Sequence, residues 1–124
     1  MAEPERTRYQ ILVVDDEPTV CKAIEMMLTF FGHEVMTAVD GPAALALFTA
    51  GRFDLVVTDY LMPGMRGDEL IAEIKQSHPG QRFILASAFA DEFLADEKPA
   101  AANHVLAKPF SLEDLRMAVV KAMA

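Results

Sequence analysis

Residues 11–18 read Ile-Leu-Val-Val-Asp-Asp-Glu-Pro, and this stretch indicates the fold class. Its four apolar residues form an unbroken run that ends in carboxylates, which is typical of a strand covered on both faces, as in a parallel sheet. Directly after Pro18, apolar side chains recur at helical spacing as far as Phe31, and Gly32 follows where a left-handed residue would end the helix. The stretch therefore predicts a buried strand that leads straight into a helix.

The same alternation continues along the chain. Further strands are predicted at residues 34–38, 55–58, 82–86 and 105–107, with a helix after each. Between residues 90 and 103 the pattern is interrupted, because Pro99 forbids a continuous helix and the fourth helix must be short or irregular. Alternating strands and helices of this kind predict an α/β domain with a doubly wound parallel sheet, layered between helices on both faces.

Capping signals mark the starts of two of these helices. Asp40 precedes a Gly-Pro pair, as expected for a residue whose side chain caps a helix that begins with proline in its first turn. Ser111 and Asp114 have the spacing of a capping box. In the last helix, which follows this box, the apolar residues that share one face are Leu112, Leu115, Val119 and Met123.

Length and composition limit the class of protein. A chain of 124 residues has room for one domain, and we expect residues 1–8 to form a flexible tail and residues 9–124 to fold. The composition is 52% hydrophobic and 24% charged, which is globular rather than disordered. The formal net charge of −8 would repel a phosphate backbone, so direct binding of nucleic acid is not expected.

Cysteine content and the absence of targeting signals indicate the compartment. Cys21 is the only cysteine and cannot form an internal disulfide. The sequence contains neither a signal-peptide core nor a run of about 20 apolar residues that could span a membrane. We therefore expect a cytoplasmic protein that does not contact a membrane.

Five polar residues lie at or just after the predicted carboxyl ends of strands, where ligands bind in doubly wound sheets. They are Asp15, Asp16, Asp59, Ser87 and Lys108. Three clustered carboxylates repel one another unless a cation is bound, and hard oxygen ligands suit Mg²⁺. A lysine would add a second positive charge, so that the oxygens of a phosphoryl group could be neutralised while a carboxylate attacks phosphorus in line. The pattern predicts a site that forms an aspartyl phosphate.

Four motifs contain these polar residues, namely Ile11-Leu-Val-Val-Asp-Asp-Glu-Pro18, Val57-Thr-Asp-Tyr-Leu-Met-Pro-Gly64, Ile84-Leu-Ala-Ser-Ala88 and Lys108-Pro-Phe110. With these motifs the sequence resembles the receiver domains of two-component response regulators, in particular those of the chemotaxis-regulator type. The resemblance extends from Tyr9 onward and implies a flavodoxin-like sheet of five strands in the order 2-1-3-4-5.

The resemblance also implies a role for each residue of the site. Asp59 would be the phospho-acceptor, and Lys108 and Ser87 would each contact a phosphoryl oxygen. Mg²⁺ would be held by Asp16 directly, by Asp15 largely through water, by Asp59 and by the backbone carbonyl of Leu61. The peptide bond between Lys108 and Pro109 would be cis and would aim the lysine into the site.

The partners implied are a sensor histidine kinase or a phosphotransfer protein as donor, and a downstream protein or an output domain outside these residues as receiver of the signal. Phosphorylation could also drive formation of a homodimer. Val105 stands where many receivers have an aromatic switch residue, so the output is expected to be atypical. Phe89 and Leu61 are apolar where receivers control water access, which predicts slow loss of the phosphoryl group.

Two alternatives belong to other classes. A phosphatase of the haloacid-dehalogenase type also forms an aspartyl phosphate, but it needs Asp-x-Asp after the first strand, and Asp15-Asp16-Glu17 does not provide that motif. A degenerate receiver would bind partners without phosphate, which the intact acidic residues and lysine argue against. Nucleotide binding has no support, since neither GxxxxGK[ST] nor GxGxxG occurs.

Overall fold

In a computed structural model of the chain, which describes residues 8–88 and 102–124, five parallel strands form one sheet in the order β2-β1-β3-β4-β5. Each strand differs from its predicted range by at most one residue at either end. This confirms the flavodoxin-like, doubly wound topology. The strands are β1 (Gln10–Val14), β2 (Glu34–Ala38), β3 (Leu55–Asp59), β4 (Arg82–Ser87) and β5 (His104–Ala107).

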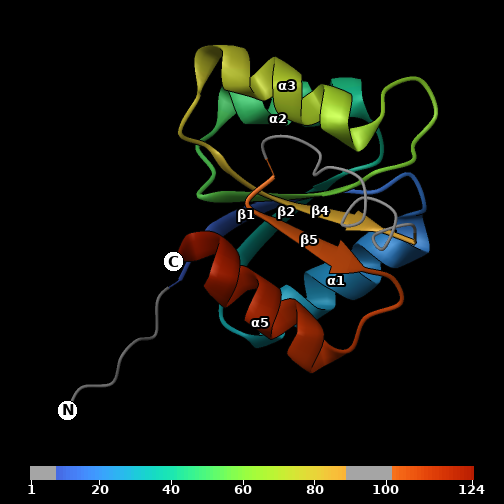
Figure 1. The fold of residues 1–124 in the computed structure, drawn as a ribbon, viewed down its shortest axis with the longest axis vertical. Helices are drawn as coiled ribbons and strands as arrows, with labels where there is room; N and C mark the ends of the chain where they lie inside the picture. Colours follow the sequence, from blue (N-terminus) through green and yellow to red (C-terminus); the bar gives the residue numbers. More distant parts are fainter. Residues whose placement is uncertain (1–7, 89–101) are drawn as a thin grey trace.

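Helices cover both faces of the sheet (Figure 1). In the described part of the chain they are α1 (Pro18–Phe30), α2 (Gly41–Ala50), α3 (Gly67–Ser77) and α5 (Leu112–Met123). Figure 1 shows α2 and α3 together on one face, and α1 and α5 on the other. Of the segment predicted to be irregular, residues 90–101 lie outside the described residues.

The central strand β1 shows why both faces need a cover. Ile11 and Val13 pack into the core beneath α1 and α5, whereas Leu12 and Val14 pack into the core beneath α2 and α3. All four are at most 1% exposed. Successive side chains of a strand point to opposite faces, so an unbroken apolar run requires two cores.

The helix ends confirm the predicted signals. Gly32 follows α1 with a φ of 99°, a conformation that glycine adopts without strain. The side chain of Asp40 accepts a hydrogen bond from the backbone N–H of Ala43 at 2.8 Å, and Ser111 and Asp114 form both bonds of a capping box at 3.0 Å. These local interactions start and stop the helices at the predicted residues.

One prediction for α5 is only partly right. Leu115 and Val119 are buried as expected, but Leu112 is 42% exposed, and Ala118 and Ala122 complete the buried face instead. Periodicity identifies the face of a helix that packs inward, but it does not show how far along that face the neighbouring elements extend.

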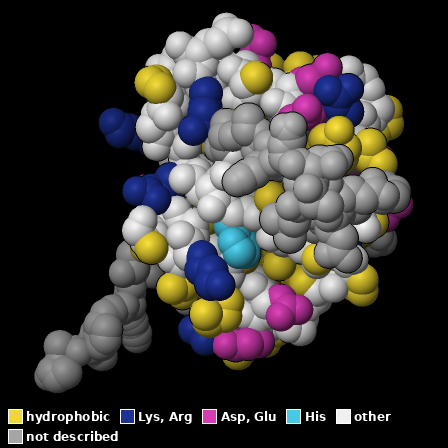
Figure 2. Space-filling view, viewed as in Figure 1, with side chains coloured by type: hydrophobic (Ala, Val, Ile, Leu, Met, Phe, Trp, Pro, Cys, Tyr) yellow, Lys and Arg dark blue, Asp and Glu magenta, His cyan; other side chains and the backbone are white. Residues whose placement is uncertain are grey.

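The surface carries charges of both signs. On the face shown in Figure 2, the Lys and Arg side chains stand apart from one another, with uncharged surface between them. None of the helices within residues 8–88 and 102–124 combines the length and the apolar character that a membrane crossing requires.

His33 joins the start of β1 to the end of α1 at the edge of the sheet opposite the carboxyl ends. Its Nδ1 accepts a hydrogen bond from the backbone N–H of Tyr9 at 3.1 Å, and the two rings stack with centroids 5.3 Å apart. Burial lowers the pKa of His33 below its ordinary value, and the positive charge of Arg8 lowers it further. Folding therefore favours the neutral form of this imidazole.

Acidification is expected to destabilise the protein through His33. Because its folded pKa lies below the unfolded one, the unfolded state takes up a proton first, and stability falls as the pH drops from about 7 through the unfolded pKa of about 6.5. Denaturant unfolding at several pH values should show that His33→Asn, which keeps an acceptor in place of Nδ1, loses less stability on acidification than the wild type. Parallel pH profiles for the two proteins would contradict this role.

Candidate functional site

The sheet register brings the predicted site residues to one edge. Val14 pairs with Thr58 across β1 and β3, so Asp15 and Asp59 lie side by side at the next position. Asp15, Asp16 and Asp59 each offer one carboxylate oxygen, and these oxygens lie within 4.8 Å of one another. The prediction that carboxylates from separate parts of the chain meet at the carboxyl edge is confirmed.

Lys108 bridges two of these carboxylates. Its Nζ lies 3.0 Å from Oδ2 of Asp15 and 3.0 Å from Oδ1 of Asp59. The side chains are 23%, 2% and 11% exposed, respectively, so the three charges are largely shielded from water. The backbone N–H of Lys108 also donates to the carbonyl of Ser87 at 2.9 Å, and the peptide bond to Pro109 is cis, as predicted.

Electrostatics leave the cluster short of positive charge. Burial raises the pKa of Asp59 above its ordinary value, and repulsion from Asp15 raises it too, although the hydrogen bond from Lys108 opposes both. Burial lowers the pKa of Lys108, but hydrogen bonds to Asp59 and Asp15 outweigh that effect and the net pKa is raised. One ammonium among three carboxylates leaves a negative excess that would attract a cation.

The carboxylates of Asp15 and Asp16 differ in the interactions that they make. The backbone N–H of Asp15 donates a hydrogen bond to the carbonyl of Ala38 at 3.1 Å. Its Oδ1 accepts a hydrogen bond from the N–H of Glu17 at 3.0 Å, and its Oδ2 accepts one from Nζ of Lys108. Among the described residues, no hydrogen bond or ion pair involves the carboxylate of Asp16. Asp16 is therefore the more available of the two as a direct ligand.

A pocket opens beside the cluster. Its volume is about 140 Å³ and it is lined by Asp59, Leu61, Ser87, Ala88 and Lys108. At about 30 Å³ per water molecule this holds several waters or a phosphoryl group. Ser87 is 2% exposed, whereas the side chain of Leu61 is 51% exposed at the pocket.

The structure describes Val105 but not Phe89, the two residues expected to affect the output and the loss of the phosphoryl group. Val105 is partly buried on β5, so a valine occupies the position expected for an aromatic switch. Phe89 lies outside the described residues, and slow loss of the phosphoryl group stays a prediction.

Gly67 is a structural residue of the site that no motif in the sequence identified. Gly67 is the first residue of α3, and its N–H donates to the carbonyl of Tyr60 at 2.8 Å. A Cβ at this position would lie 2.2 Å from the carbonyl oxygen of Asp59. The start of α3 is thus seated against the backbone of Asp59, a contact that only glycine permits. The signal in the sequence that could have indicated this contact is a glycine at the start of the helix that follows β3.

Comparison with known proteins gives the family. The sequence model of the response regulator receiver domain matches residues 11–120. The sensor kinase CckA of Brucella abortus is 37% identical over 88% of this chain, which spans only 12% of that protein. Sporulation initiation phosphotransferase F of Bacillus subtilis is 31% identical, over 90% of this chain and 91% of that one.

A solved structure agrees with these relatives. The response regulator TrrA from Thermotoga maritima, in complex with Mg²⁺ and BeF, is 35% identical and superposes with a TM-score of 0.83, covering 91% of this chain and 97% of that one. The family match, the sheet order and the acidic edge agree on one assignment. This chain belongs to the response regulator receiver domain family, the signalling domains of two-component systems.

Proposed function

We propose that this receiver domain accepts a phosphoryl group on Asp59 and that residues 9–124 form the functional unit. The observation that carries the proposal is the bridge of Lys108 between Asp15 and Asp59 beside an open pocket. This arrangement supports the proposal, because a carboxylate, an ammonium group and space for a phosphoryl group meet at one point.

The transfer can be written with this chain's own atoms. A carboxylate oxygen of Asp59 attacks the phosphorus of a phosphohistidine and forms a P–O bond. The P–N bond of the donor breaks, and its electron pair returns to the imidazole nitrogen. The products are an acyl phosphate on Asp59 and, because the other ring nitrogen of the phosphohistidine already carries a proton, a neutral imidazole on the donor. Lys108 is within reach of the oxygens that gain charge in this step, and electrostatic stabilisation of that kind is a large part of phosphoryl-transfer catalysis.

Receiver domains bind Mg²⁺ at an acidic site, and the donor set here fits that ion. The carboxylates of Asp16 and Asp59 and the carbonyl of Leu61 would hold it, with Asp15 acting through water because both of its oxygens already have partners. All of these are hard oxygen donors, which Mg²⁺ prefers. When bound, the ion would neutralise charge on the phosphoryl oxygens.

Ser87 and Lys108 are proposed to report the phosphorylated state. Ser87 lines the same pocket as Asp59 and ends β4, so its hydroxyl can reach a phosphoryl oxygen. The negative charge of the phosphoryl group would then attract the side chains of Ser87 and Lys108. Their movement would shift the equilibrium between two conformations of the surface around β4 and β5. The degenerate, phosphate-independent receiver is disfavoured, because the three carboxylates cluster at one edge and Lys108 bridges two of them.

Receiver domains act with histidine kinases or phosphotransfer proteins, and we infer such a donor for this chain. The signal would pass to a downstream protein or an output domain, with homodimer formation as one route and without direct contact to nucleic acid. A cytoplasmic location is supported by the single, buried and unpaired Cys21.

The first measurement is the intact mass of the protein after incubation with MgCl₂ and acetyl phosphate. We expect a gain of one phosphoryl group that is absent with EDTA and is lost in mild base, because acyl phosphates hydrolyse readily there. Reduction with borohydride followed by peptide sequencing should locate the modified residue at Asp59. Absence of any mass gain with this donor and with a phosphorylated phosphotransfer protein would overturn the proposal in favour of the degenerate receiver.

A further inference from the structure

Gly41, the first residue of α2, leaves a space that Met65 fills. A Cβ built on Gly41 would lie 2.5 Å from Sδ, 2.9 Å from Cβ and 3.0 Å from Cγ of Met65. The Met65 side chain therefore packs closely against the Cα of Gly41, and a larger residue at position 41 would force Met65 to move. The contact joins two segments that are 24 residues apart in the sequence.

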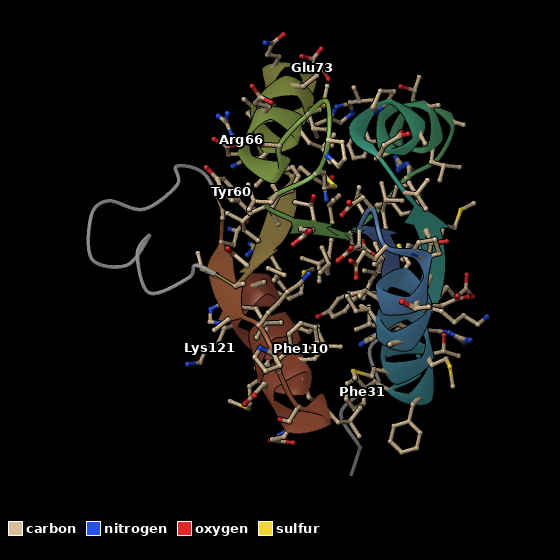
Figure 3. All side chains as sticks on the ribbon, turned by 90° about the vertical axis from the view of Figure 1, so that its right-hand side faces the viewer. Phe31, Tyr60, Arg66, Glu73, Phe110 and Lys121 are labelled. Carbon is tan, nitrogen blue, oxygen red and sulfur yellow. The ribbon has the colours of Figure 1, made fainter. Side chains whose placement is uncertain are left out.

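Met65 belongs to the loop that carries Leu61. The two ends of this loop lie beside each other (Figure 3), with the Arg66 guanidinium 5.9 Å from the ring centroid of Tyr60 and the N–H of Gly67 bonded to the carbonyl of Tyr60. Met62 is 6% exposed and anchors the middle of the loop in the core beneath α2 and α3. The ends of the loop are closed and Met62 is anchored, so Met65 is the further side chain of the loop that packs against Gly41 at the start of α2.

Gly41 directly follows the short connection between β2 and α2. At the start of this connection the carbonyl of Ala38 accepts the backbone N–H of Asp15 at 3.1 Å, and at its end Asp40 caps α2. One short segment thus touches the backbone of Asp15 on one side and the loop of Leu61 on the other. It spans the gap between the two segments that would supply the oxygen ligands.

We propose that the Gly41–Met65 contact is a positioning device that sets the separation between the Asp15-Asp16 segment and the Leu61 carbonyl, and so tunes the affinity of the site for a divalent cation. Gly41 and Met65 touch no ligand themselves and act through the backbone. This inference rests on the proposed metal site. Residues that hydrogen-bond to metal ligands typically change metal affinity by tenfold or more when replaced, and the lower end of that range is expected for a contact that acts through packing.

The backbone at Gly41 does not itself require glycine. Among the glycines of the described residues, a φ in the left-handed region occurs at Gly32 and Gly64. Alanine at position 41 should favour the helix, because it restricts the unfolded chain. Any harm from Gly41→Ala must therefore come from the displacement of Met65, which makes the substitution a direct probe of the contact.

The experiment compares four variants by titrating MgCl₂ into metal-free protein and following amide shifts by NMR, with denaturant unfolding in EDTA alongside. Gly41→Ala and Met65→Ala should each weaken Mg²⁺ binding by about tenfold. The double variant should recover much of this loss, because the new methyl group occupies space that Met65 vacates. Gly51→Ala is the control, since a Cβ at the other end of α2 meets its neighbours at an ordinary 3.6 Å, and it should bind Mg²⁺ like the wild type.

The outcomes separate positioning from simple packing. If the two single variants change the unfolding midpoint but keep the wild-type dissociation constant for Mg²⁺, the contact is only structural and the inference is wrong. The same holds if the double variant binds no better than the single variants. If the wild type itself does not bind Mg²⁺, the proposed metal site fails first, and that result is distinct from a failure of the variants alone.

Discussion

Asp59→Asn is expected to abolish phosphorylation while making the metal-free protein more stable. The amide nitrogen and oxygen of asparagine are poor nucleophiles and cannot form the acyl phosphate, so no gain in mass should follow incubation with Mg²⁺ and acetyl phosphate. Loss of activity without loss of stability is the signature of a residue retained for chemistry rather than for folding.

The gain in stability follows from the pKa of Asp59. Burial and the charge of Asp15 raise that pKa above its ordinary value, so the folded state binds a proton more readily than the unfolded state. At neutral pH both states are ionised, and the folded state bears the cost of a partly buried charge. Asparagine removes this cost and can still accept the hydrogen bond from Lys108.

The measurement is intact mass after phosphorylation, paired with denaturant unfolding at pH 7 in EDTA. Asp40→Asn is the matched control, because asparagine caps a helix as well as aspartate does, and this variant should still be phosphorylated. Phosphorylation of Asp59→Asn, or a lower unfolding midpoint than the wild type, would contradict the role given to Asp59.

Gly67→Ala is expected to lower the free energy of unfolding by about 3 kcal/mol, at the upper end of the cost of overpacking. The new Cβ would meet the carbonyl oxygen of Asp59 at 2.2 Å and Cδ1 of Leu85 at 2.9 Å. The leucine can rotate, but the carbonyl belongs to the backbone of β3, so either α3 or the end of β3 must move. A shift of β3 would also carry Asp59 away from Lys108.

Chemical denaturation of Gly67→Ala against wild type measures the effect, and Gly80→Ala serves as the control. A Cβ at Gly80 has no atom within 4 Å, and its φ lies outside the left-handed region, so this substitution should leave stability within about 0.5 kcal/mol. An equally small change in Gly67→Ala would show that the start of α3 is not held against Asp59.

Local patterns were enough to predict most of the architecture. The run of residues 11–14 predicted a strand buried on both faces because side chains alternate, and the structure puts its residues into two separate cores. Asp40 and Ser111 predicted helix starts because a cap forms within three or four residues. Each of these features depends on neighbours in the sequence. The order of the strands in the sheet, in contrast, was implied by the resemblance to receiver domains.

The site was predictable in part for the same reason. Parallel strands in a doubly wound sheet all present their carboxyl ends at one edge, so residues that follow strands must gather there. That rule predicted that Asp15, Asp59 and Lys108 lie close together. The face of α5 was less predictable, since spacing placed Leu112 with buried residues although it is 42% exposed.

The sequence by itself therefore determined the helices and strands, their order along the chain and the sheet edge at which the site lies. These features follow from short-range periodicity and from the chirality of parallel connections. Only the tertiary structure decided which atoms meet. The ion pair of Lys108 with Asp15 joins residues that are 93 positions apart in the sequence. The close contacts of Gly67 with Asp59 and of Met65 with Gly41 depend on how closely two segments approach each other. Such distances are set by the packing of the whole core, and no local pattern in the chain encodes them.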